Sequence, residues 1–204
     1  VAGRLPADGI EISELTALAP LQDKRIDDLV RKKWGSVKQS TPEEKLAIVR
    51  RLNNDLRAGA GDPAAGKEQF KKHCATCHRL YDVGNSVGPE LTTANRTDRD
   101  FLLTSAVDPS GAIRKEYLAY VLHCKDGRVL TGLIVQQTPT ELTILTAKNE
   151  RVSVRADDVE STTESAVSLM PEKLLEALQP QELRDLFSFL QSTPPKPTAR
   201  ADAK

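Results

Sequence analysis

The amino-acid sequence predicts a mainly α fold with a small antiparallel β-sheet insertion and an N-terminal helical extension. Three observations carry this prediction. Apolar residues recur at helical spacing over residues 1–60 and again near the C-terminus. Between about residues 116 and 162 the apolar period changes to two, which is typical of strands. Glycine and proline cluster between these regions, where turns and element ends need them.

Composition excludes several classes of protein. The 204-residue chain is long enough for one sizeable domain or two small ones. Lys and Arg together number 29, and Asp and Glu together also number 29, so the formal charge is zero. Nothing in this balance argues for a nucleic-acid partner. No apolar run approaches the length of a membrane span, so we expect none. Three cysteines are too few for a disulfide scaffold.

Helix start signals divide the helical regions. Thr41-Pro42-Glu43-Glu44 has the pattern of a capping box with proline at the first helical position, and Gly59 follows the helix it would open. Asp62-Pro63 predicts a second start, for a helix that carries Gly66 and Phe70 and reaches residue 78. Further helices are expected from Thr97, as a cap, to Val107, and from Pro180 onward. Residues 193–204 are proline-rich and polar, which predicts a disordered tail.

The predicted β insertion, at about residues 116–162, contains four strands. Their residues are rich in Val, Ile, Leu, Thr and Tyr, and each connection has the composition of a turn. Asp126-Gly127 is the strongest hairpin signal among these connections. The expected strands cover residues 117–124, 128–137, 141–145 and 151–154.

The motif Cys74-Ala75-Thr76-Cys77-His78 has the pattern Cys-x-x-Cys-His, which is the attachment signature of haem c. On a helix, positions three and four apart share one face, so Cys74, Cys77 and His78 would point the same way. Two thiols can then form thioethers with the haem vinyl groups while the imidazole of His78 binds the iron. A zinc site would need four ligands, and the third cysteine, Cys124, is far along the chain. A thioredoxin-like redox pair would instead follow a strand.

An iron bound by His78 has a sixth coordination position, and Met170 is the first candidate for it. Met170 is the only methionine, and a thioether is a soft, neutral ligand that raises the reduction potential. The structural alternative is a methionine that fills a gap in the core. His123 is the second candidate ligand, and a vacant sixth position is the third alternative.

Together these residues resemble the class I cytochromes c. The resemblance implies a cytochrome c-like helical fold around a covalent haem, with Pro89 and Leu91 among the cofactor-binding residues. It implies that the backbone oxygen of Pro89 accepts the other N–H of His78, which fixes the ring. It also implies that the first and last helices cross at Gly66, with Phe70 and Phe189 packed there. The matching positions are Gly66, Phe70, Cys74, Cys77, His78, Gly88, Pro89, Leu91, Met170, Leu186 and Phe189.

More specifically, the pattern resembles the C-terminal haem-binding domain of large secreted proteins of planctomycetes and verrucomicrobia, the Pirellula/Verrucomicrobium type. That resemblance covers about residues 60–192, so residues 61–192 are interpreted as the cytochrome domain. In that family a helical-repeat stack and a dehydrogenase-like propeller often precede the haem domain, so residues 1–60 are interpreted as the end of such a stack. No propeller is expected within these 204 residues, which leaves the substrate unidentified. The matching motifs are Asp108-Pro109-Ser110, Tyr117-Leu118-Ala119-Tyr120, Asp126-Gly127-Arg128 and Leu169-Met170-Pro171-Glu172.

The resemblance implies a monohaem domain that transfers single electrons and is not itself an enzyme. Its donor would be a fused or partner dehydrogenase, and its acceptor a cytochrome or oxidase. Because haem is attached to such motifs outside the bacterial cytoplasm, a periplasmic or exported protein is expected. The alternatives are a haem peroxidase or gas-sensing domain with a labile sixth ligand, and a zinc-binding or structural module without haem. The β insertion could cover a haem edge, dock a partner or form a homodimer, and Cys124 could pack in a strand or link two chains.

Overall fold

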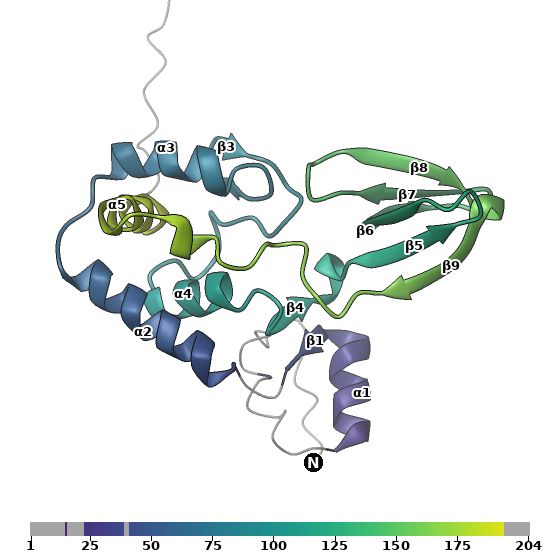
Figure 1. The fold of residues 1–204 in the computed structure, drawn as a ribbon, viewed down its shortest axis with the longest axis horizontal. Coiled ribbons are helices and arrows are strands. Elements are labelled where there is room, and N and C mark those ends of the chain that lie inside the picture. The colour runs from purple at the N-terminus through teal and green to yellow at the C-terminus, as the bar shows by residue number, and fades with distance from the viewer. Residues whose placement is uncertain (1–14, 16–22, 39–40, 194–204) are drawn as a thin grey trace, which may run out of the picture.

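The computed structural model describes residues 15, 23–38 and 41–193. In space, a group of helices lies at one end of the fold and a five-stranded antiparallel sheet at the other, and short connections around β4 (Ala112–Arg114) join them (Figure 1). Of the described residues, 39% are helical and 24% are in strands. The prediction of a mainly α fold like that of a class I cytochrome c is therefore wrong. The sheet is a second structural layer with its own core.

Four helices share one apolar core. α2 (Glu43–Arg57) falls in the expected N-terminal segment and contributes Val49, Leu52 and Leu56 to this core. The core therefore extends across the expected boundary at residue 60. Phe70 from α3 is fully buried in it. The four helices are α2 (Glu43–Arg57), α3 (Pro63–His73), α4 (Arg99–Val107) and α5 (Pro180–Leu190).

The helix ends follow some of the sequence signals and not others. The Asp62 side chain caps α3 by accepting a hydrogen bond from the Ala64 N–H, and Pro63 is the first helical residue, as predicted. The predicted capping box of α2 is wrong, because the N-cap is Pro42 and no side chain caps it. At α4 the cap is Asp98 rather than Thr97, and its carboxylate accepts from the Phe101 N–H at 2.9 Å.

The crossing of α3 and α5 is as the resemblance implies. A Cβ atom added to Gly66 would lie 1.9 Å from the Asp185 carbonyl oxygen and 2.8 Å from Phe189 Cβ. Only glycine allows the two backbones to approach this closely. The rings of Phe70 and Phe189 pack beside the crossing with centroids 5.5 Å apart. The Asp62 N–H donates to the Asp185 carboxylate at 2.8 Å, which also ties the start of α3 to α5.

The large sheet has five strands where four were expected. Its order is β8-β7-β6-β5-β9, and every neighbouring pair is antiparallel. β9 lies at an edge beside β5, and only its first residue, Val159, is apolar. A strand at the edge of a sheet can pair through its backbone without alternating apolar and polar residues. The spacing of apolar residues in the sequence therefore did not predict β9. The strands are β5 (Tyr120–Cys124), β6 (Val129–Gln137), β7 (Glu141–Leu145), β8 (Arg151–Arg155) and β9 (Val159–Glu164).

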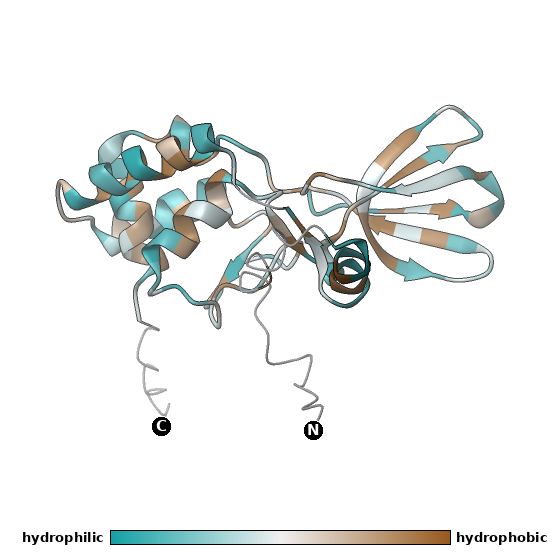
Figure 2. Ribbon diagram, turned by 90° about the horizontal axis from the view of Figure 1, so that it is seen from below, coloured by the Kyte–Doolittle hydropathy of each residue, from teal (hydrophilic) through white to brown (hydrophobic). Residues whose placement is uncertain are grey.

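Apolar side chains of β5, β7 and β8 build a second apolar core. Figure 2 shows hydrophobic and hydrophilic bands alternating along these strands. In β5, Leu122 and Cys124 are buried while His123 between them is exposed. The buried residues of this core are Leu122, Cys124, Leu142, Ile144 and Val154.

The described residues before α2 are not entirely helical. After α1 (Lys24–Lys33), β1 (Gly35–Val37) pairs with β4 (Ala112–Arg114). Gly35 has a φ of +117°, which side chains other than glycine rarely adopt, and this bend turns the chain from the helix into the strand. Residues 1–14, 16–22, 39–40 and 194–204 lie outside the described residues, so most of the predicted tail is untested. No described helix combines the length and apolar character needed to cross a membrane.

Candidate haem-binding site

The Cys-x-x-Cys-His motif forms a separate turn directly after α3. α3 ends at His73 and Cys74 is its C-cap, so the motif does not continue the helix as expected. The His78 N–H donates to the Cys74 carbonyl at 2.8 Å, and the Cys77 N–H donates to the same oxygen at 3.0 Å. Because these hydrogen bonds close one helical turn, Cys74, Cys77 and His78 lie within a single turn of backbone.

The imidazole of His78 is fixed by the backbone of a facing loop. Its Nδ1 lies 2.9 Å from the Pro89 carbonyl oxygen. A carbonyl only accepts, so Nδ1 carries the proton and Nε2 has a free lone pair. A Cβ at Gly88 would lie 2.7 Å from His78 Cε1, so the backbone at this glycine lies directly against the ring. Burial lowers the pKa of His78, partly opposed by the bond to Pro89, so the ring is neutral at pH 7.

Both motif cysteines are free thiols with partial exposure. Burial raises the pKa of Cys74 to about 12, and the neighbouring Cys77 adds to the rise. Burial also raises the pKa of Cys77. The Cys77 Sγ lies 3.6 Å from the carbonyl oxygen of Ala147, in the turn between β7 and β8. Both thiols are therefore protonated at neutral pH and lie in apolar surroundings.

The loop after the motif is bonded back onto it. It contains the short hairpin of β2 (Arg79–Leu80) and β3 (Val83–Gly84). The Asn85 N–H donates to the Ala75 carbonyl at 3.0 Å, and the Gly88 N–H donates to the Cys77 carbonyl at 2.7 Å. The side chain of Leu91, a predicted cofactor-binding residue, packs against the helical core. These contacts place Pro89 where its carbonyl meets His78.

A small apolar cluster connects the motif to the sheet and to the loop that carries Met170. Val87, Leu133 and Leu145 are its buried members, and Cys77, Tyr117 and Leu169 pack against them. Leu133 and Leu145 belong to β6 and β7, so the sheet contacts the motif directly. Met170 is half-buried next to Leu169, and its N–H donates to Ser168 Oγ at 3.1 Å.

No protein-family model and no curated protein sequence matches this chain. The resemblance to haem-binding domains therefore rests on the motif residues and on their arrangement.

The structure does not bring His123 to the motif. Its side chain is on the exposed face of β5, between the strand partners Val129 and Ser161. β5 runs away from the helical part, and His123 is close to its far end (Figure 1).

Cys124 is 3% exposed in the second core, which confirms its predicted packing in a strand. Within the described ranges, no group of three or more His, Cys, Asp and Glu residues could hold a metal ion.

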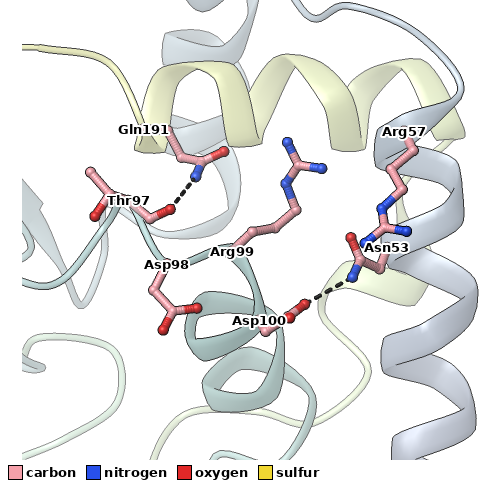
Figure 3. Close-up of a pocket in the computed structure, with 7 residues that line it drawn as sticks. All are labelled: Asn53, Arg57, Thr97, Asp98, Arg99, Asp100 and Gln191. Carbon is pink, nitrogen blue, oxygen red and sulfur yellow. Dashed lines mark hydrogen bonds between the residues drawn. The ribbon is translucent and has the colours of Figure 1, made fainter.

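A separate shallow pocket of about 330 Å³ lies between α2, α4 and the end of α5 (Figure 3). Asn53 donates to Asp100 at 2.8 Å, and the Gln191 amide donates to the Thr97 carbonyl at 3.2 Å. None of the predicted cofactor-binding residues lines this pocket. The lining residues are Asn53, Arg57, Thr97, Asp98, Arg99, Asp100 and Gln191.

Sequence reasoning missed the contribution of the sheet to this site. Leu133 and Leu145 read only as strand residues, and nothing in the order of residues relates them to Cys77. Tyr117 was noted as part of a strand motif, yet it lies before β5, in the 3₁₀ turn Lys115–Tyr117. Contacts between distant segments carry no local signal, so only the folded chain reveals them.

The donor set fits a haem c. It comprises two uncharged thiols within one turn and a neutral imidazole whose Nδ1–H is anchored by Pro89. That second hydrogen bond is what a metal-binding histidine needs to fix its tautomer and ring orientation. Met170 is the one thioether available in the chain.

Proposed function

We propose that this chain is a monohaem c-type cytochrome domain that transfers single electrons. The observation that carries the proposal is the anchored imidazole of His78 within one turn of Cys74 and Cys77. In the proposal Cys74 and Cys77 hold haem c through thioethers, and His78 and Met170 are the iron ligands. Bound there, haem supplies a one-electron ferric–ferrous couple.

The protein residues would hold this site rigid and exclude water from it. The Pro89 carbonyl keeps the proton on Nδ1, so the Nε2 lone pair of His78 stays available in a fixed direction. The close crossing at Gly66 fixes the helix that precedes the motif. Val87, Leu133 and Leu145 provide an apolar wall beside Cys77. With His78 and Met170 both bound to the iron, no coordination position would remain for a substrate, so we propose a carrier rather than an enzyme.

The partners and location in this proposal come from the resemblance. An electron would enter from a fused or partner dehydrogenase and leave to a cytochrome or oxidase. Covalent haem attachment implies a periplasmic or exported protein. The neutral overall charge gives no preference for a strongly acidic or basic partner.

The first test is the intact mass of the protein made together with haem-maturation machinery. We expect the mass of the polypeptide plus one haem, and the mass of the bare polypeptide from the Cys74→Ser/Cys77→Ser double variant. A parent protein with the bare polypeptide mass would refute the proposal.

The second test distinguishes the ligand sets by absorption spectra in both redox states. We expect the weak red-edge band of methionine-bound ferric haem in the parent protein, and its loss in Met170→Ala. Rapid binding of carbon monoxide to the reduced parent protein would instead favour the peroxidase or gas-sensing alternative.

A further inference from the structure

The loop that carries Met170 has no regular secondary structure. It spans residues 165–174, between the end of β9 at Glu164 and the 3₁₀ turn Leu175–Ala177, and it crosses from the sheet to the helices (Figure 1). Methionine has a flexible, unbranched side chain. The position of the Met170 thioether therefore depends on the contacts that hold this loop.

The first half of the loop is anchored by backbone and serine hydrogen bonds. The Ser165 N–H donates to the Ala119 carbonyl at 2.8 Å. The Ser168 N–H donates at 3.1 Å to the hydroxyl of Ser110, a residue buried after α4. The hydroxyl of Ser168 in turn accepts the N–H of Met170. Up to Met170 the loop is therefore tied to Ala119, just before β5, and to Ser110, just after α4.

The second half of the loop is held by an ion-pair network and by Leu174, which packs against the helical core. The Lys45 ammonium of α2 lies 2.7 Å from Asp108 Oδ1 and 2.7 Å from Glu172 Oε1. The Asp108 side chain is 1% exposed, that of Lys45 16% and that of Glu172 48%. Glu172 comes two residues after Met170. Lys45 therefore joins the loop to α2 and to the end of α4.

Asp108 fixes the position of the Lys45 ammonium group. Asp108 caps the C-terminus of α4, and its backbone N–H is bonded to the Thr104 carbonyl. Its Oδ2 is buried without a hydrogen-bond partner in the structure, so the charge of this carboxylate is balanced by Lys45 through Oδ1. A buried carboxylate needs such a partner. Glu172 thus binds a cation that is already immobilised, rather than a free surface lysine.

We propose that Lys45, held by Asp108, is a positioning residue that fixes Met170 for iron binding by tethering the loop through Glu172. This inference rests on the proposed function, because it assigns Met170 as the sixth ligand. In it, α2 belongs functionally to the haem site, although it lies in the segment that the sequence assigned to an N-terminal extension.

The competing explanation is that Lys45 serves only to neutralise Asp108. The chain offers a matched control for this explanation. Arg51, also on α2, lies 3.3 Å from Glu176 Oε2, beyond the Met170 loop. Both pairs join a cation of α2 to a glutamate of the same C-terminal segment. Only Glu172 lies next to Met170, so the two glutamates separate ligand positioning from general stability.

The experiment compares Glu172→Ala with Glu176→Ala in the haem-loaded protein. Glu172→Ala leaves the buried pair of Lys45 and Asp108 intact, so the variant folds. Losing an ion pair with a half-exposed carboxylate raises the equilibrium constant for opening of the loop by up to about fivefold. We expect Glu172→Ala to bind carbon monoxide up to about fivefold faster when reduced, with a weaker red-edge ferric band and a lower midpoint potential. We expect Glu176→Ala to match the parent protein in carbon monoxide binding rate, ferric band and midpoint potential.

A haem-independent readout completes the test. Amide hydrogen exchange across residues 165–174 of the protein without haem is expected to be faster in Glu172→Ala than in Glu176→Ala. Equal carbon monoxide rates and equal exchange in parent and Glu172→Ala would overturn the inference while leaving the proposed function intact. Equal changes in both variants would also overturn it, because they indicate general loosening. A parent protein without covalent haem would instead reject the proposed function.

Discussion

The close approach of α3 and α5 at Gly66 can be tested with the substitution Gly66→Ala. Helix propensity alone predicts a gain, because alanine in a helix interior is more favourable than glycine by about 1 kcal/mol. The structure predicts the opposite sign. The added methyl group would lie 1.9 Å from the Asp185 carbonyl oxygen and 2.6 Å from the Asp185 carbonyl carbon. These are backbone atoms, so no side-chain rotation can relieve the overlap.

The size of the effect follows from the displacement required. Ordinary van der Waals contact begins at 3.4 Å, so the Asp185 oxygen must move from 1.9 to 3.4 Å, which is a shift of about 1.5 Å. Such a shift separates the rings of Phe70 and Phe189, which pack at 5.5 Å, and opens the core beside them. Overpacking of this kind costs about 1–3 kcal/mol. We expect Gly66→Ala to lower the free energy of unfolding by about 2 kcal/mol.

Urea unfolding, followed by far-UV circular dichroism, measures this difference with both proteins in the same haem-loading state. Gly59→Ala is the matched control, because its added methyl group would meet only the flexible side chain of Arg184, at 3.4 Å. We expect the control to differ from the parent by less than about 0.5 kcal/mol. A Gly66→Ala variant as stable as the parent, or more stable, would show that the helices do not approach as described.

Two further predictions concern the motif in the protein without haem. Since burial raises the pKa of Cys74 to about 12 from an ordinary 9.0, its thiolate fraction at pH 8 is about a thousandfold below that of a free cysteine. Mass spectrometry after timed iodoacetamide treatment should find Cys74 alkylated far more slowly than the same peptide in urea, and equal rates would contradict its burial. Burial also lowers the pKa of His78 below 6.5, so the unfolded chain binds a proton there before the folded chain does. The contribution of the neutral His78 imidazole to the free energy of unfolding is fully present above pH 6.5 and is lost as the pH falls through the folded pKa. The urea midpoint should therefore fall in that range less steeply for His78→Gln than for the parent.

The sequence anticipated the local elements whose signals are contained within a few residues. Asp62-Pro63 marked the start of α3, because a capping carboxylate and an N-terminal proline act on the turn they begin. Runs rich in β-branched and aromatic residues between turn signals indicated β5 to β8. β5 shows the alternating burial of a half-exposed sheet, whereas four successive residues of β7 are buried. β9 was missed because its pairing depends on the backbone of β5, and Thr41 was misassigned as a cap because a capping pattern can occur without the contact.

For the candidate site, the sequence by itself determined which donor atoms the chain offers: two thiols three residues apart, the adjacent imidazole, and one thioether. The close crossing at Gly66 was implied only by the resemblance, and the structure confirms it. Only the tertiary structure decided that residues of β6 and β7 pack beside the motif and that His123 lies on an exposed face away from it. It also decided that Lys45 forms an ion pair with Glu172, 127 residues further along the chain. The physical reason is that thiol and imidazole chemistry belongs to the residue, whereas burial and ion pairing belong to pairs of segments that only folding brings together.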